Sequence, residues 1–310
     1  MKNIIDKILK TDELSPDEIC TVLSADNTDH LFEKANQVKE SKLGKTVKIL
    51  GLIQICNICT ENCLYCENRK DNPKQRYNLS PAEIINISKE FSKTGIKDVI
   101  LQSGNTPTIS TEDICKIIEK LKIYRINVTP ALGERNEAEY RMLQAAGAEK
   151  IALNLITSSF TLFGELHPDM SLIGRIAALK FIKKHKMKSL TGILAGFPNQ
   201  NRYSLAEDIL TLKKLSVNAV EIIPFIPKSD TPLNIENAVR IDKILKVIAL
   251  TRLIMPDTDI IISEDIREID KNGIFKALQC GADTIIKNLT DCNCNKKDTD
   301  ISYLKATNSQ

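Results

Sequence analysis

Four of the nine cysteines of this chain lie close together in the segment "CNICTENCLYC", at positions 56, 59, 63 and 66. The N-terminal stretch "MKNIIDKILKTDELSPDEI" carries charges every few residues and lacks the apolar core of a signal peptide. We therefore expect a cytoplasmic protein, in which cysteines usually stay reduced. Clustered thiols then indicate metal binding or catalysis more than a disulfide framework. The segment therefore predicts a metal centre.

The spacing of these cysteines distinguishes between the kinds of metal centre that they could form. Structural zinc modules place about a dozen or more residues between two cysteine pairs, whereas three residues separate Cys59 from Cys63. Ferredoxin-type runs leave two, two and three residues between cysteines, and here the order is two, three and two. Thiolates from Cys59, Cys63 and Cys66 would instead suit a 4Fe–4S cluster whose fourth iron stays open. Cys56 is then a small buried residue, and a role as a fourth ligand is the alternative.

The three-cysteine spacing, with Tyr65 before the last cysteine, resembles the defining motif of the radical S-adenosylmethionine (SAM) enzymes. This resemblance implies a 4Fe–4S cluster held by Cys59, Cys63 and Cys66, with SAM bound at the open iron. It also implies that SAM is cleaved reductively to a 5′-deoxyadenosyl radical, which abstracts hydrogen from a substrate.

The likeness is greatest to the [FeFe]-hydrogenase maturase branch of this family, in which methylornithine synthases and biotin synthases are the next relatives. It rests on "CTENCLYCENRKDNPKQRYNLSPAEI", "VILQSG", "LGE", "GFPNQ", "PFIPKSDTPL", "ALTRLIMPD" and "LQCGA" in this order. By this resemblance, Arg175 pairs with the SAM carboxylate, a task that suits its planar fork of donors. The other implied residues are Tyr65 beside the cluster, Ser103 and Gly104 beside the SAM amino group, Glu134 in the barrel mouth, Gly192 and Gly196 beside adenosine, and Pro224 near adenine.

This chain also departs from the maturase pattern. Asn105 stands where a glutamate is expected, and Asn154-Leu155-Ile156-Thr157 replaces an Arg-His-Glu-Thr run. Lost charges should alter the electrostatic field of the pocket, so the substrate could differ. Near the C-terminus, Cys292 and Cys294 are too few for the accessory cysteine trio that some maturases carry.

The cysteine segment follows the first of eight short apolar runs that alternate with helical windows. The runs span residues 47–55, 97–102, 126–131, 150–155, 188–195, 218–223, 258–263 and 283–287, and the windows span 80–94, 110–122, 135–147, 171–186, 203–215, 236–254 and 265–279. Strands that alternate with helices indicate a parallel sheet, and eight such units predict an α/β protein with a (β/α)8 TIM-like barrel. Loops after the strands should then meet at one rim, where such barrels hold their active sites.

The predicted organisation has three parts. Residues 1–45 read as two or three amphipathic helices that form a lid or plug, residues 46–290 form the barrel, and residues 291–310 form a polar tail. The formal net charge is +3, and basic residues alternate with acidic ones, which gives no case for binding nucleic acid. No apolar run approaches the roughly 18 residues of a membrane span, so a cytoplasmic protein is expected.

Together these features predict a radical SAM enzyme of the hydrogenase-maturase type that acts on a small, amino-acid-derived substrate. The expected partners are that substrate, an electron donor such as ferredoxin or flavodoxin, and other hydrogenase maturases. One alternative is a carbon-skeleton rearrangement similar to that of methylornithine synthase. The alternative from another class is a non-catalytic iron–sulfur scaffold or electron carrier, which would hold metal without affinity for SAM.

Overall fold

A computed structural model describes residues 2–10 and 13–290. Its eight strands are all parallel and pair in the order β3-β2-β1-β8-β7-β6-β5-β4. They are β1 (Lys48–Gln54), β2 (Asp98–Gln102), β3 (Asn127–Ala131), β4 (Lys150–Ala152), β5 (Lys188–Ala195), β6 (Ala219–Pro224), β7 (Asp259–Ser263) and β8 (Thr284–Asn288). The sheet curls into a nearly closed barrel in which β3 and β4 form the seam. The predicted (β/α)8 TIM-like barrel is confirmed.

The helices that follow the strands form the outer ring of the barrel. They are α4 (Pro81–Ser92), α5 (Thr111–Ile123), α6 (Glu137–Ala146), α7 (Phe160–Leu166), α8 (Leu172–Lys184), α9 (Arg202–Leu215), α10 (Ile241–Ile254) and α11 (Gly273–Gln279), with a 3₁₀ turn, η1, at Glu264–Glu268. Ser80 caps α4 with a reciprocal hydrogen-bonded box, and Gly147 ends α6 in the left-handed conformation. Local capping signals therefore fix where these helices begin and end.

Several elements differ from the sequence prediction. The predicted helical window 265–279 divides into η1 and α11, and α10 begins at Ile241 instead of residue 236. Strand β4 ends at Ala152 instead of residue 155, although Ile156, with a φ of 69°, still pairs with Ile193 of β5 as an isolated parallel bridge. Helix α7 was not predicted, since its seven residues are too few to show a clear helical period.

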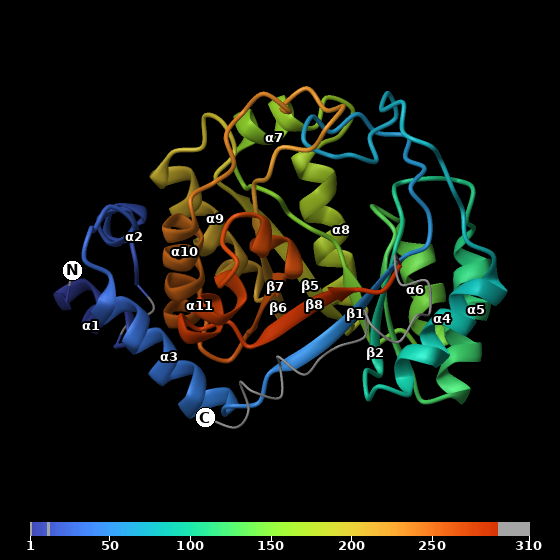
Figure 1. Cartoon of the computed structure of the whole chain (residues 1–310), viewed down its shortest axis with the longest axis horizontal. Coiled ribbons are helices and arrows are strands. Elements are labelled where there is room, and N and C mark those ends of the chain that lie inside the picture. Colours follow the sequence, from blue (N-terminus) through green and yellow to red (C-terminus); the bar gives the residue numbers. More distant parts are fainter. Residues whose placement is uncertain (1, 11–12, 291–310) are drawn as a thin grey trace.

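The N-terminal segment forms three helices, α1 (Lys2–Ile8), α2 (Pro16–Leu23) and α3 (Asp29–Leu43). They pack on the outer helices α9, α10 and α11 instead of forming a lid or plug over the barrel (Figure 1). The side chain of Lys39 joins the two parts, because its Nζ donates to the Leu278 carbonyl oxygen at 2.7 Å. The proposed boundary at residue 45 stays a prediction, and the proposed polar tail at 291–310 lies outside the described residues.

The barrel interior is stacked in layers along its axis. The middle layer is apolar and contains Ile100, Ala152, Leu190, Ala219, Ile261 and Ile286. Below it, a 660 Å³ cavity at the strand starts is lined by charged residues, among them Lys48 and Asp259, which form a 2.5 Å ion pair. Above it, a 420 Å³ cavity lies at the strand ends. The smaller upper cavity is the candidate site, since enzymes of this fold act from the C-terminal ends of the strands.

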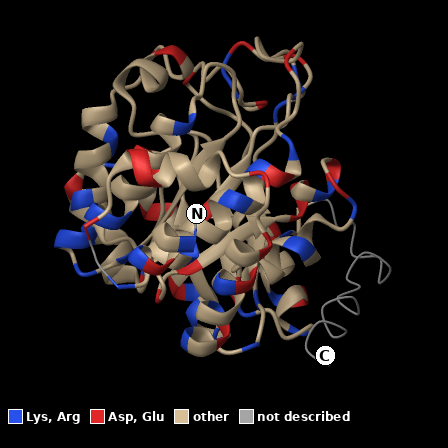
Figure 2. Cartoon of the chain, turned by 90° about the vertical axis from the view of Figure 1, so that its left-hand side faces the viewer, with Lys and Arg blue, Asp and Glu red and all other residues tan. Residues whose placement is uncertain are grey.

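The loops that surround this upper cavity come from distant parts of the sequence. The loop after β1, helix α7 and the loop after β6 gather at one end of the molecule (Figure 1). On the face that carries the N-terminus, basic and acidic residues intermingle (Figure 2). In the part of the chain that the structure describes, no helix is both long and apolar enough to cross a membrane.

Candidate functional site

The cysteine loop connects β1 to α4 and lies over the C-terminal end of the barrel. Cys59, Cys63 and Cys66 are each partly exposed, and Cys66 lines the upper cavity together with Tyr65. Burial raises the pKa of the Cys63 thiol to about 12 and that of Cys66 to about 11. The charge of Cys59 contributes to both increases, and that of Cys66 contributes to the increase at Cys63. Without metal the thiols of Cys63 and Cys66 stay protonated at neutral pH, and metal binding must release their protons.

The three thiols fit an iron–sulfur cluster better than a single metal ion. Among the described residues, no three His, Cys, Asp or Glu side chains converge closely enough to hold one ion. In a 4Fe–4S cluster each thiolate binds a different iron atom, so its sulfur ligands lie farther apart than those around one ion. Soft thiolates are the ligands that such clusters require.

Cys56 points away from this group. It is fully buried, its Sγ accepts a hydrogen bond from the Ile58 N–H at 3.3 Å, and it lies 3.8 Å from Thr108 Oγ1. The interpretation of Cys56 as a small buried residue agrees with this environment. Cys292 and Cys294 lie outside the described residues.

Gly104 supports the cysteine loop from below. A Cβ atom at this position would lie 2.4 Å from the Ile58 carbonyl oxygen and 2.6 Å from Cys59 Cβ. Glycine is therefore required so that the loop can rest directly on the end of β2. The neighbouring Ser103 is buried and lines the cavity, and its hydroxyl donates to the Gly104 carbonyl oxygen at 2.8 Å.

The segment that follows α7 holds the cysteine loop from the side. The Leu64 N–H donates to the Leu166 carbonyl oxygen at 2.9 Å, and the Asn62 N–H donates to Asp169 Oδ2 at 3.1 Å. Two backbone donors of the cysteine loop are thus satisfied by a segment about 100 residues away in sequence.

Tyr65 and His167 form a third link between these segments. His167 Nδ1 lies 2.9 Å from the Phe163 carbonyl oxygen, which can only accept, so this nitrogen carries the proton. Burial lowers the pKa of His167 to about 4, so the ring is neutral and its Nε2 accepts from the Tyr65 hydroxyl at 3.0 Å. His167 therefore orients the Tyr65 hydroxyl and braces the loop after α7.

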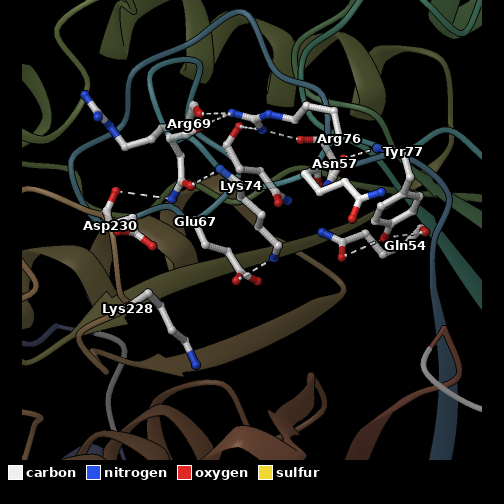
Figure 3. Close-up of polar contacts among 12 residues, drawn as sticks. Gln54, Asn57, Glu67, Arg69, Lys74, Arg76, Tyr77, Lys228 and Asp230 are labelled. Carbon is white, nitrogen blue, oxygen red and sulfur yellow. Dashed lines mark hydrogen bonds and ion pairs between the residues drawn. The ribbon is translucent and has the colours of Figure 1, made fainter.

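Arg76 organises the chain after the last cysteine, and sequence reasoning missed it. Its guanidinium donates to five backbone carbonyl oxygens (Figure 3), those of Asn57, Asn68, Arg69, Lys70 and Asn72. These carbonyl groups lie on both sides of the cysteine cluster. One side chain therefore fixes where the loop begins and where it ends.

Arg175 lies at the wall of the cavity with most of its donors engaged. It is only 6% exposed, although it lies on the outer-ring helix α8. Its Nε donates to Glu134 Oε1 at 2.7 Å, and Nη1 donates to the Asn154 carbonyl oxygen. Among the described residues, the acceptor of Nη2 is the Met170 sulfur at 3.6 Å. Because a thioether is a weak acceptor, Nη2 is the donor best placed for an added carboxylate.

The remaining predicted residues divide between two places. Pro224 ends β6 and lines the upper cavity. Gly192 lies inside the barrel, where a Cβ atom would be 2.9 Å from Asn154 Oδ1 and 3.0 Å from the Glu221 carbonyl oxygen. Gly196 lies elsewhere: it has a φ of 95°, and a Cβ atom there would meet Val239 Cγ2 at 2.1 Å. Turn geometry and packing on Val239 account for Gly196, so a place beside adenosine rests on the resemblance alone.

The floor of the upper cavity is polar, which the sequence analysis did not detect. Its polar residues at the strand ends are Gln54, Gln102, Asn154, Glu221 and Ser263. Burial raises the pKa of Glu221 to about 7, although a side-chain hydrogen bond from Asn154 lowers it. The available signal was one acidic residue in the apolar run "NAVEII".

The two departures from the maturase pattern have clear structural settings. Ile156 contributes to an apolar cluster with Leu194 and Phe225, and its φ of 69° is strained for a β-branched residue. Asn105 donates from Nδ2 to Glu61 Oε1 at 2.8 Å and accepts from Arg135 Nη1 at 3.2 Å. A carboxylate of the cysteine loop, Glu61, thus lies beside the position where the resemblance expects a glutamate.

Comparisons with known proteins agree with this site. The Radical SAM superfamily matches residues 53–212, and the Biotin and Thiamin Synthesis associated domain matches residues 216–306. The [FeFe] hydrogenase maturase subunit HydE of Thermotoga maritima is 34% identical over 84% of this chain and 75% of its own length. The 3-methylornithine synthase of Methanosarcina barkeri is 27% identical over 90% of this chain and 81% of its own length. A crystal structure of methylornithine synthase superposes with a TM-score of 0.87 at 22% identity, covering 99% of this chain and 95% of that one.

Proposed function

Because this chain belongs to the Radical SAM superfamily, we propose that it starts a radical reaction on a small, amino-acid-derived substrate in the upper cavity. Enzymes of this family use a 4Fe–4S cluster and SAM, and the bound cluster supplies the electron that cleaves SAM to methionine and a 5′-deoxyadenosyl radical. The observation that carries the proposal is that Cys66, Ser103 and Arg175 line one cavity at the C-terminal ends of the strands.

Within this proposal the residues of the chain have distinct tasks. Cys59, Cys63 and Cys66 hold the cluster, and Arg175 holds the SAM carboxylate through Nη2 while Glu134 fixes its orientation. Tyr65 covers the cluster from the α7 side, where His167 orients its hydroxyl. Ser103 and Pro224 lie where the cavity wall can contact SAM. Polar groups of the floor then remain for the substrate.

Maturation of [FeFe]-hydrogenase is the biological role that the 34% identity to HydE supports best. The partners would be the other hydrogenase maturases and an electron donor such as ferredoxin or flavodoxin. A carbon-skeleton rearrangement is the second candidate. Ile156 favours it, because an apolar side chain at this position removes a carboxylate that the maturase pattern places near SAM and substrate.

The test is anaerobic reconstitution with iron and sulfide, then reduction, addition of SAM and assay of 5′-deoxyadenosine. We expect 5′-deoxyadenosine from the unaltered protein and from the control Cys115→Ala, whose thiol lies on α5 outside the cysteine loop. We expect none from Cys63→Ala. A cluster that assembles but never binds SAM would favour the scaffold or electron-carrier alternative. To separate the two enzymatic roles, candidate substrates are compared for how strongly each accelerates SAM cleavage.

A further inference from the structure

Glu221 occupies an unusual place on the floor of the upper cavity. It lies at the middle of β6, directly opposite Gly192 of β5 in the sheet register. Because Gly192 has no side chain, Asn154 from the loop after β4 extends over β5, where its Oδ1 would lie 2.9 Å from a Cβ atom of residue 192, and its amide lowers the pKa of the Glu221 carboxyl group. Glu221 is thus held by a neutral amide and remains open to the cavity.

Some charged residues that line the upper cavity form ion pairs with other described residues, whereas two of its carboxyl groups do not. Glu67 pairs with Lys74 at 2.9 Å, Lys228 with Glu268 at 3.0 Å, and Arg175 with Glu134 at 2.7 Å. Glu221 and Asp265 also line the cavity. Within the described ranges, neither has a lysine or arginine nitrogen within 4 Å. The positive charge of Lys228 lowers the pKa of Asp265, whereas no cation in the described part of the chain influences that of Glu221, so Glu221 is the carboxyl group left without a cationic partner.

The electrostatic setting of Glu221 favours a cationic ligand. Burial raises the pKa of its carboxyl group to about 7, and the negative charge of Asp265 raises it further. An ionised carboxylate in such a place is costly unless an opposite charge comes close. A ligand that brings a positive charge would remove this cost, whereas a ligand carboxylate would add to it.

We propose that the floor formed by Glu221, Asn154 and Gly192 binds a protonated amine of the substrate, with the Glu221 carboxylate accepting from the ammonium group. Gln54, Gln102 and Ser263 supply further uncharged polar groups around it. This inference rests on the proposed function, because it assumes that SAM occupies the cluster end of the same cavity. It adds that the substrate carries its positive charge at the end that reaches the barrel interior.

The experiment uses the reconstituted holoenzyme with SAM and three probes of one length: n-butylamine, n-butanol and n-butyrate. Binding is measured by ligand-observed NMR on the oxidised protein at pH 8, so that no turnover is needed. We expect n-butylamine to bind about tenfold or more tightly than the other two, since a charge-assisted hydrogen bond is lost with each. In Glu221→Gln, the affinity for n-butylamine should fall about tenfold or more. The control Glu207→Gln makes the same change on the exposed side of α9 and should keep the affinity of the unaltered protein.

The outcomes distinguish this inference from the proposed function. Equal or tighter binding of n-butyrate, or an unchanged n-butylamine affinity in Glu221→Gln, would overturn the inference while SAM binding stands. A Glu221→Gln protein that loses affinity for SAM but not for n-butylamine would also overturn it, because Glu221 would then serve the SAM cation. Failure of the unaltered protein to bind SAM would instead contradict the proposed function. The unfolding midpoint of each variant is recorded to confirm that it is folded.

Discussion

Glu134 accepts a 2.7 Å hydrogen bond from Nε of Arg175, although the two residues lie on different elements, the loop after β3 and helix α8. This contact and the hydrogen bond from Nη1 to the Asn154 carbonyl oxygen fix the orientation of the guanidinium group. Its Nη2 then contacts a weak acceptor, the Met170 sulfur. We therefore propose that the pair works as an oriented receptor for a carboxylate. Arginine suits this task because its donors keep a fixed planar fork.

The Arg175–Glu134 pair leads to a prediction about SAM affinity. Arg175→Lys should weaken SAM binding at least about tenfold, because lysine is a single point charge without the fork. Glu134→Gln keeps an acceptor for Nε and should have a smaller effect. Calorimetric titration of SAM into the reconstituted variants measures both. A lysine variant that binds SAM as tightly as the unaltered protein would show that Arg175 does not hold the carboxylate.

The cysteine loop predicts a simple pattern of iron content. Alanine at Cys59, Cys63 or Cys66 should leave less iron and sulfide after anaerobic reconstitution, because a cluster with three protein ligands cannot spare one of them. Alanine at Cys56 should retain the full amount, since its sulfur is fully buried and bonded to the Ile58 N–H. Iron analysis and the visible absorption of the cluster are the measurements. Loss of iron from Cys56→Ala, with its fold intact, would identify Cys56 as a ligand.

Gly104 should tolerate no side chain, because a Cβ atom there would meet the Ile58 carbonyl oxygen and Cys59 Cβ. Gly104→Ala must therefore displace the cysteine loop, and we expect a protein that folds but reconstitutes poorly. Gly164→Ala is the matched control, since nothing lies within 4 Å of its Cβ position on α7. It should raise the free energy of unfolding by about 0.5–1 kcal/mol and leave the iron content unchanged. Normal iron content in Gly104→Ala would disprove the close support of the loop.

More of the fold than of the candidate site could be predicted from the sequence. The apolar run at 188–195 coincides with β5, because β-branched runs between capped helices are local signals. The position of Arg175 beside Glu134 is not local, since 41 residues separate them. Glu221 was missed for a related reason: strand residues alternate between the two faces, and the sequence does not show which face of β6 points inward. Ile156 was noticed only as a substitution, because backbone strain has no signature in residue type.

The contact between Tyr65 and His167 predicts a measurable coupling. His167→Leu leaves the Tyr65 hydroxyl without its acceptor, and Tyr65→Phe leaves Nε2 without its donor. Each single change should cost about 1–3 kcal/mol of unfolding free energy, but the double variant should cost less than their sum by about 1 kcal/mol. Chemical denaturation of the metal-free proteins measures the cycle. If the contact also positions the cysteine loop, both single variants should lose a reconstituted cluster faster in air. Additive losses of unfolding free energy in the double variant would refute the contact.

Glu221 makes the stability of the protein depend on pH in a direction that can be derived. Its folded pKa of about 7 lies above the ordinary value of 4.5, so the unfolded chain ionises first as the pH rises. Well below pH 4.5 the Glu221 carboxyl group is protonated in both the folded and the unfolded state, so it does not reduce stability. Between pH 4.5 and 7 it ionises in the unfolded state first, and folding becomes progressively less favourable. The full penalty, about 3 kcal/mol, is reached above pH 7.

Glu221→Gln cannot ionise and should escape this penalty. Denaturant unfolding of the metal-free proteins should find the variant more stable than the unaltered protein at pH 8, with the difference vanishing near pH 4.5. Glu149→Gln is the matched control, because it makes the same change on an exposed side chain just before β4. A stability difference that is the same at pH 5 and pH 8 would contradict the derivation. A gain in stability together with a loss of amine affinity would show that the folded protein keeps a costly carboxyl group in order to bind its ligand.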